Sequence, residues 1–395
     1  MNIEEPHVQQ DIAPLWRLAF RAGFLGAGLF AVAAMIRWLL WVEAPAGWTA
    51  EISPQWWHAH EMIFGFALPV VAGFLLSAVA VWTGIAGTKG LRLQVLFGAW
   101  LLARIILWLA PSAVLLAWAA EMLFIALLIY ELGSRVWARR QWRNMLFLPV
   151  LLGLAVLNTT SYATADDFIL STRLHYSAVW LITIIITIVG GRVTPLFTAN
   201  RLGLKKRPLP DWLEYSAIGS VALVAGLLAI WPMPLITDQL QVLCLLAFCI
   251  HLYRLAHWQG WKTGSVPLLW SMHLSYLCIP LALLGIAIVG DNPVAVKNIM
   301  HLLAIGTIGG MILAMMSRVS LGHTGRAMEL SGGVATAFAL IFIAAIVRAI
   351  LPIIDPVLTH WSWRISAALW IVAFAVFVFR YYPVLTKPRV DGKPG

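Results

Sequence analysis

Histidine side chains recur along this chain near the starts of long apolar segments. His58 and His60 open the second such segment, His175 the sixth and His301 the tenth. Arg, Lys or Asp at the centre of a bilayer costs roughly 2.5–3.5 kcal/mol on insertion scales, so a layer of ionisable groups at one depth needs a chemical reason. Neutral imidazole is a ligand for haem iron and for copper. The spacing therefore predicts a metal or haem site.

The sequence His58-Ala59-His60-Glu61 constrains how two of these histidines are used. Residues advance about 100° each around a helix, so the two imidazoles point roughly 200° apart and do not share one metal ion. They serve two centres on opposite sides of the helix, or they are a pair of interfacial histidines. Glu61 either orients a ligating imidazole and relays protons, or is a first-turn acid that favours the helix dipole.

Six basic residues fall in the same layer as these histidines, and the other Lys and Arg residues fall on the opposite side. Single arginines of this kind often snorkel to the headgroups. Several of them beside histidines instead predict an anionic ligand, and haem propionates fit. Arg37, Arg104 and Arg348 are the predicted propionate partners, and the other three residues of the layer are Arg173, Lys297 and Arg364.

The elements that must position these side chains are membrane-spanning helices. The chain has 395 residues, of which 61% are hydrophobic and 11% charged, and its mean hydropathy is +0.86. These values exclude an ordinary soluble domain and indicate an all-α polytopic membrane protein. At roughly 20 apolar residues per span, we predict twelve spans, at 16–41, 57–82, 90–110, 112–137, 142–162, 170–194, 211–231, 239–260, 266–289, 296–317, 333–350 and 360–382.

The connections between these spans alternate in charge, one set rich in Lys and Arg and the other in Asp and Glu. The positive-inside rule then places both termini on the cytoplasmic side of the membrane. Membrane topology accounts for the net charge of +10 and leaves no reason to expect nucleic acid as a partner. We predict one transmembrane domain over 1–395, with a helical bundle at 16–382 and cytoplasmic tails at 1–15 and 383–395.

A spacing shared by two spans suggests an internal repeat. His175 precedes Arg192 by the same 17 residues (192 − 175) that separate His301 from Arg318 (318 − 301). A three-fold repeat of four helices would place the second, sixth and tenth spans in equivalent positions. We therefore expect His60, His175 and His301 to converge, with the two arginines near the opposite membrane face.

Other motifs indicate packing. The three cysteines lie in apolar segments without CxxC spacing, so they support neither a disulfide framework nor a thiolate zinc site. Three further histidines, His251, His257 and His273, are typical of hydrogen-bonded packing residues. His323 is a loop cap or a docking element for a partner. No catalytic triad, phosphate loop or HExxH motif occurs.

Three segments together resemble the NnrS family. They are His58-Ala59-His60-Glu61-Met62 with Gly65 and Ala72-Gly73-Phe74-Leu75-Leu76; Gly191-Arg192-Val193-Thr194-Pro195-Leu196-Phe197-Thr198; and the stretch from His301 through Gly306, Gly309 and Gly310 to Ser317-Arg318-Val319-Ser320-Leu321-Gly322-His323-Thr324-Gly325-Arg326. The resemblance implies a twelve-helix bacterial inner-membrane protein that binds haem and copper and is associated with nitric oxide metabolism and tolerance of nitrosative stress.

The arrangement is also similar to the catalytic subunit of haem-copper oxidases and nitric oxide reductases. It departs from those enzymes in one respect, because their His-x-His pair lies on the tenth helix and their His-His pair on the seventh. Here His-x-His is on the second helix and the seventh has no histidine. This departure argues against a copper site with three imidazole ligands.

The sequence as a whole favours a membrane protein with haem of type b, and with copper as a second candidate cofactor, that binds or reduces nitric oxide near the outer membrane face. The predicted ligands are His58, His60, His175 and His301. An oxidoreductase would draw electrons from a quinol or another donor, and membrane lipid is the other expected partner. The alternatives are a secondary transporter of a metal or nitrosylated species and a haem-based nitric oxide sensor. The oligomeric state stays open.

Overall fold

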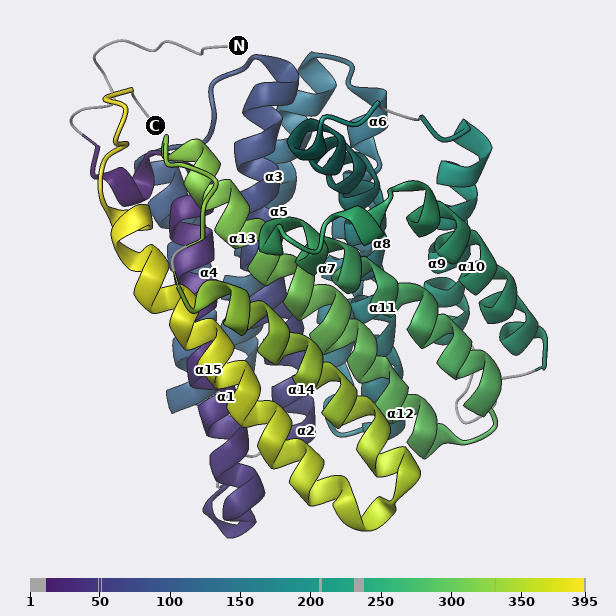
Figure 1. Cartoon of the computed structure of the whole chain (residues 1–395). Helices are drawn as coiled ribbons and strands as arrows, with labels where there is room; N and C mark the ends of the chain where they lie inside the picture. Colours follow the sequence, from purple (N-terminus) through teal and green to yellow (C-terminus); the bar gives the residue numbers. More distant parts are fainter. Residues whose placement is uncertain are drawn as a thin grey trace.

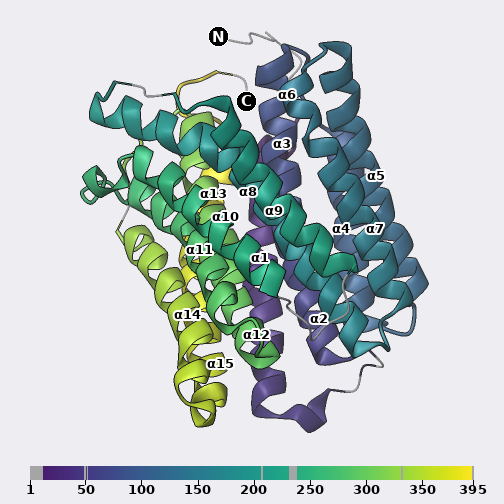
Figure 2. The ribbon, with the colours of Figure 1, turned by 90° about the vertical axis from the view of Figure 1, so that its right-hand side faces the viewer.

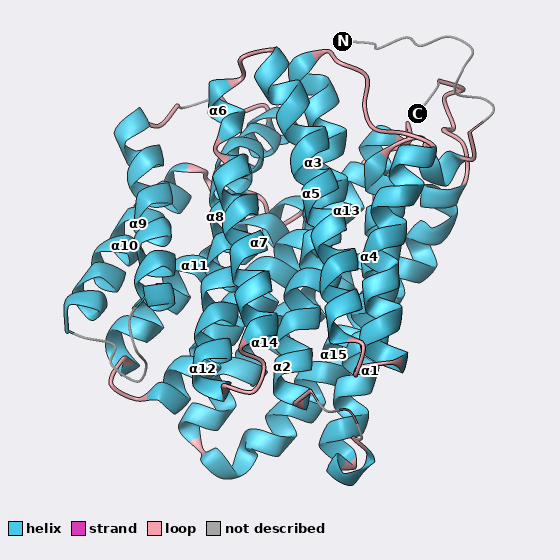
Figure 3. Cartoon of the chain, turned by 180° about the vertical axis from the view of Figure 1, so that it is seen from behind, coloured by secondary structure: helices cyan, strands magenta, loops and turns pink. Residues whose placement is uncertain are grey.

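The computed structural model describes residues 12–48, 50, 52–205, 208–230, 238–330 and 332–393. Within these ranges all regular structure is helical, and no strand occurs (Figure 3). Twelve helices are long and apolar enough to cross a membrane, which confirms the predicted number. The chain is an integral membrane protein.

The first six spans follow the predicted positions closely. They are α1 (Ala19–Glu43); α2, the π-helical segment η3 and α3 (Pro54–His60, Glu61–Ala67 and Leu68–Thr83); α4 (Leu91–Leu109); α5 (Val114–Ala138); α6 with α7 (Trp142–Met145 and Phe147–Ala163); and α8 (Phe168–Leu202). The sixth span runs past its predicted end at 194, because the helix continues through Pro195 and stops only at Gly203, which has a left-handed backbone (φ 63°).

The last six spans complete the bundle. They are α9 (Asp211–Ile230); α10 (Asp238–His257); α11 (Pro267–Val289); α12, the π-helical segment η5 and α13 (Pro293–His301, Leu302–Gly309 and Gly310–His323); α14 (Val334–Ile354); and α15 (Thr359–Thr386). Short 3₁₀ turns occur at η1 (Pro14–Trp16), η2 (Pro45–Gly47), η4 (Gly260–Lys262) and η6 (Pro356–Leu358).

Most consecutive spans pack against each other, and the last span closes on the first through the contact of α15 with α1. Figure 2 shows α14 and α15 on one side of the bundle and α4, α5 and α7 on the other. Each span must bury part of its surface against neighbours. Short connections between antiparallel helices make the neighbour in sequence the neighbour in space.

Three spans lie at the centre of the bundle. In the most apolar stretch of each, 83% of the residues are buried in the second span, 61% in the sixth and 83% in the tenth, against 28–56% in the other nine. The central spans also touch one another, through α2 with α8 and α8 with η5. This is the convergence at four-span intervals that the sequence predicts.

Two of the central spans change helical type at the same point. In the second span the α-helix gives way to the π-helical η3 directly after His60, and in the tenth it gives way to η5 directly after His301. π-Helical turns occur often at functional sites. The η3 carbonyl of Gly65 accepts a hydrogen bond from the Trp100 indole at 3.0 Å.

The two ends of the bundle differ in what they hold. We call them the α2 end, where α2 and α12 lie, and the α6 end, where α6 and α13 lie (Figure 1). Segments flanking the first and last spans both lie at the α6 end, where Gly90 N–H donates to the Trp16 carbonyl and Val390 N–H to the Thr324 carbonyl. Because the number of spans is even, the segment before the first span and the segment after the last span lie on the same side of the membrane.

Candidate functional site

A cavity opens at the α2 end, with about 1470 Å³ of empty space when the open solvent at its mouth is included. It lies between the first, second, sixth, tenth, eleventh and twelfth spans. Among the residues that the structure describes, no Asp or Glu lines it. The lining includes His58, His175 and His301, the cations Lys297 and Arg348, the rings of Trp38, Trp56, Phe66, Tyr176, Trp363 and Trp370, and the thioethers of Met35, Met62 and Met300.

The three histidines differ in which ring nitrogen is free. The His58 ring stacks on Trp38, with centroids 4.1 Å apart, and its Nδ1 is buried without a hydrogen-bond partner. Nδ1 of His301 lies 2.9 Å from the Lys297 carbonyl. Because a carbonyl only accepts, Nδ1 carries the proton and Nε2 keeps its lone pair.

His175 is held at its other nitrogen, since Nε2 lies 3.0 Å from Ser161 Oγ. Although the three histidines face one cavity, they do not form a compact cluster. In the described part of the chain, no three His, Cys, Asp or Glu side chains are grouped so that they could hold a metal ion together.

Two fixed cations make the cavity electropositive. Arg348 is 8% exposed, and its Nη1 donates to Asn298 Oδ1 at 2.6 Å. The Lys297 ammonium lies 5.9 Å from the centre of the Phe168 ring. With no acidic side chain on the described lining, these charges favour an anionic ligand.

Three other basic residues of the predicted outer layer, Arg37, Arg104 and Arg364, make their contacts outside the cavity lining. Arg37 lies among three indole rings, at 4.6, 4.6 and 4.9 Å from the ring centres, and donates to the Trp108 carbonyl. Arg364 forms a salt bridge with Glu43, with Nε 2.6 Å from Oε1. Arg104 lies in a separate buried network.

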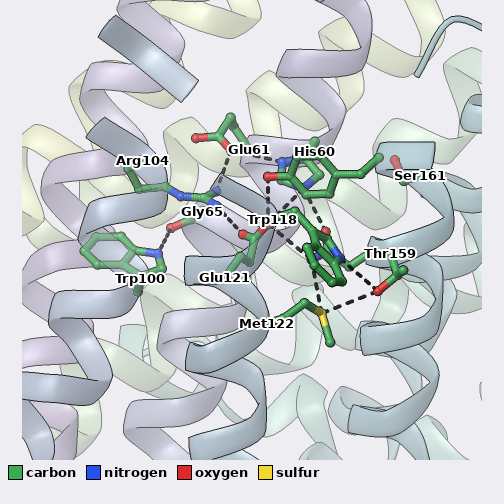
Figure 4. A network of polar contacts seen from close by, with 12 residues as sticks. His60, Glu61, Gly65, Trp100, Arg104, Trp118, Glu121, Met122, Thr159 and Ser161 are labelled. Carbon is green, nitrogen blue, oxygen red and sulfur yellow. Dashed lines mark hydrogen bonds and ion pairs between the residues drawn. The ribbon is translucent and has the colours of Figure 1, made fainter. Parts of the chain in front are cut away.

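That network surrounds His60 (Figure 4), which does not line the cavity. Arg104 Nη1 donates to Glu61 Oε1 at 2.5 Å, and Nη2 donates to Glu121 Oε1. His60 Nδ1 lies 3.0 Å from Glu61 Oε1, and His60 Nε2 lies 2.8 Å from Asn158 Oδ1. All five residues are at most 5% exposed, so the charges compensate one another away from water.

The hydrogen bonds of this network fix where its protons lie. Asn158 donates its Nδ2 to Glu121 Oε2, so its Oδ1 faces His60 and His60 Nε2 must donate. His60 Nδ1 and Glu61 Oε1 then share one proton, because two bare acceptors 3.0 Å apart would repel. With that proton, two carboxylates and one guanidinium form a neutral group.

A tryptophan separates the network from the cavity. The Trp56 ring stacks on His60 with centroids 4.4 Å apart and planes 10° apart, and it also lines the cavity. Its indole donates to the Ser161 carbonyl at 3.1 Å. The His60 and His175 rings are 6.3 Å apart across this wall.

Like Arg37, two further side chains of the predicted site, those of His60 and Arg104, lie outside the cavity lining. Both ring nitrogens of His60 contact oxygen atoms, whereas the other three predicted ligands, His58, His175 and His301, all line the cavity. Arg104 does not line the cavity either, and two carboxylates engage its guanidinium, whereas Lys297 lies on the lining. The predicted divergence of His58 and His60 around the helix agrees with these positions.

Sequence reasoning missed the other members of the network. Glu121, Asn158 and Tyr162, whose hydroxyl donates to Glu121 at 3.1 Å, come from α5 and α7. A signal did exist, because Glu121 is an acid inside an apolar span. Such a residue pairs with another intramembrane charge, and Arg104 is at a similar depth in the preceding span.

Comparison with known proteins identifies the family of this chain. A family model described as NnrS protein matches residues 14–389, nearly its whole length. The chain belongs to the NnrS family. Membership links this chain to the response to nitric oxide. No curated protein matches it.

Proposed function

We propose that this NnrS-family chain holds haem of type b in the cavity at the α2 end, where it binds or reduces nitric oxide and so confers tolerance of nitrosative stress. The observation that carries the proposal is a cavity lined by three histidines, His58, His175 and His301, with fixed cations and no acidic side chain on its described lining. Cations enclosed in a membrane protein without an acidic partner cost free energy, which an anionic ligand would offset.

The residues present fit haem in three respects. Haem iron needs only one or two imidazoles, which suits histidines that face a common space without clustering. His58 lies on the lining, and His301 offers Nε2, with the proton on its Nδ1 held by a backbone carbonyl, as is usual for ligating histidines. Arg348 and Lys297 would pair with propionates, and indole rings would pack on a flat macrocycle.

Copper is a second candidate cofactor for the same cavity. Three thioethers, from Met35, Met62 and Met300, lie on the lining with the histidines. Thioether and imidazole are ligands for Cu(I). A site of three imidazoles is disfavoured, since no such group is assembled in the described residues. The likeness to haem-copper oxidases stays a prediction.

The orientation of the chain in the membrane is part of the proposal. We infer a bacterial inner membrane, with the α6 end in the cytoplasm and the cavity near the outer face. The support is the charge of the connections, since the loops at the α6 end carry most of the Lys and Arg residues.

When bound, haem iron would supply the atom to which nitric oxide coordinates and through which a quinol or another donor passes electrons. The protein's own residues bind and orient. His58 is held by its stack on Trp38, and His301 by Lys297. The apolar walls exclude water, while Arg348 and Lys297 offset the charge of the ligand.

Optical spectra and metal analysis of the purified protein test the proposal. We expect a Soret band with iron in fixed ratio to protein, and a loss of at least half of the haem in His58→Ala and in His301→Ala. His360→Ala is the matched control, because this exposed histidine lies at the α2 end outside the cavity lining. A protein without iron or a Soret band would refute the haem assignment and favour the transporter alternative.

Consumption of nitric oxide separates the remaining alternatives. An oxidoreductase consumes it catalytically when a reductant is supplied, whereas a sensor binds it once per haem. Full haem occupancy in both cavity-histidine variants would leave a haem protein but overturn the assigned ligands.

A further inference from the structure

The Gly191-Arg192 motif lies outside the cavity at the α2 end. Arg192 follows His175 by 17 residues (192 − 175) on the same helix α8, which corresponds to about 25 Å at 1.5 Å per residue. It therefore lies toward the α6 end, where α8 approaches the end of α10 (Figure 1). The proposed haem site gives this part of the motif no role.

A second pocket opens beside the motif, with about 970 Å³ of empty space when the open solvent at its mouth is included. Three of its lining residues carry or can accept positive charge, namely Arg192, Lys205 and His257. Thr198, Trp258 and Gln259 supply polar groups to the same lining. No Asp or Glu lines the pocket among the described residues, so its charge is uncompensated within the lining.

Arg192 is held in place at this pocket. Its Nη1 donates to Asn144 Oδ1 at 2.8 Å and its Nη2 to the Arg143 carbonyl at 3.0 Å. These two bonds use two of the five N–H groups of a guanidinium, so three remain for a ligand. Fixing the side chain in advance lowers the entropic cost of binding.

The opposite wall of the pocket is also built from fixed side chains. The Arg254 side chain packs directly on the backbone of α8 at Gly191, where an added Cβ would lie only 1.7 Å from Arg254 Nη2. Glu214 holds this guanidinium through Nη2, and the Trp258 ring centre lies 5.2 Å from it. The glycine of the motif thus lets Arg254 support the tryptophan that lines the pocket.

Two further features point to binding. Gln259 has a left-handed backbone (φ 57°), which is uncommon for a residue with a side chain and occurs often at functional sites. His257 Nδ1 lies 2.9 Å from the Tyr253 carbonyl, so Nδ1 donates there and Nε2 stays available to the pocket.

We propose that this pocket binds a phosphate group. The fork of a guanidinium matches phosphate oxygens, and a basic pocket between spans on the cytoplasmic side is suited to an anionic headgroup. The phosphate belongs either to an anionic phospholipid or to a soluble phosphate compound. This inference does not depend on haem binding.

The test uses the whole purified protein in detergent with two probes. Native mass spectrometry counts retained phosphatidylglycerol against phosphatidylcholine, and a thermal shift assay titrates inorganic phosphate. We expect Arg192→Gln to weaken binding of the effective probe by about 10- to 100-fold, as for the loss of a charge-assisted hydrogen bond. Arg318→Gln is the matched control, because Arg318 stacks on Phe197 and lies outside the pocket lining.

Each outcome has a definite meaning. Selective retention of phosphatidylglycerol identifies a lipid headgroup, and a shift with inorganic phosphate identifies a soluble ligand. Binding of neither probe by the wild-type protein, or an equal loss in Arg318→Gln, would overturn the proposal. If Arg192→Gln does not fold, the exposed Lys205→Gln variant decides, with a loss of about tenfold expected.

Discussion

Replacement of Arg104 by Leu removes the only guanidinium that contacts both Glu61 and Glu121 among the described residues. The two carboxylates are each 1% exposed at the side chain and cannot recover solvation from water. Removing one partner of a buried ion pair costs about 3–5 kcal/mol. We expect a value in this range and not twice it, because one carboxylate can take up a proton and the other still faces His60.

The assay is thermal unfolding of the purified protein in one detergent. At about 2–4 °C per kcal/mol for a large domain, the midpoint should fall by roughly 10 °C. The haem content of the folded fraction should stay unchanged, since Arg104 does not line the cavity. The opposite pattern, a normal midpoint with lost haem, would restore Arg104 as a propionate partner.

Two further variants sharpen this test. Adding Glu61→Gln and Glu121→Gln to Arg104→Leu removes the unpaired charges, so most of the lost stability should return. Arg37→Leu is the matched control, because its cation–π contacts are worth only about 1–2 kcal/mol. A midpoint for Arg104→Leu within about 2 °C of the wild type, or no recovery in the triple variant, would refute the account of a neutral buried group.

Three other predictions follow from the contacts above. Arg348→Leu should lower haem retention in a detergent wash at least twofold, while Arg364→Leu, which loses only a surface ion pair with Glu43, should not. Gly191→Ala should reduce resistance to proteolysis at the α6 end, because its Cβ would displace the Arg254 guanidinium. Hydrogen exchange at Val390, whose N–H donates to Thr324, should report the tail contact. Hydrogen bonding to Arg389 holds the pKa of Asp391 well below its usual range. The contact between Val390 and Thr324 should therefore persist from neutral pH through about pH 4 and weaken only in stronger acid. Loss of protection already at pH 6 would contradict this.

The spans were predictable because their signal is local. Eighteen or more apolar residues in sequence identify a membrane helix whatever its neighbours are. The repeat of histidine every four spans also predicted which spans are central, since only enclosed helices can hold polar side chains at that depth. The change to π-helix after His60 and His301 was not predictable, because it depends on packing against other spans.

The partners of His60 lay beyond sequence reasoning for a related reason. Its contacts with Glu121 and Asn158 join different spans, and the latter is 98 positions away in the chain. Helical geometry showed that His58 and His60 diverge, but it could not show which side faces the cavity. In the sequence, Arg104 and Arg348 are both arginines in the outer part of an apolar span. In the structure, Arg104 pairs with Glu61 and Glu121, whereas Arg348 lines a cavity without acidic side chains in the described residues.

The second span therefore separates two electrostatic environments. On the His60 side, the buried acids Glu61 and Glu121 are matched by Arg104 and one shared proton. On the His58 side, the described lining has cations without acids. Because a bilayer penalises unmatched charge, the charges on the first side are balanced within the protein, whereas the unbalanced cations on the second side support the proposed anionic ligand. Substitution of His60 should consequently act on the stability of the fold, and substitution of His58 on what the cavity binds.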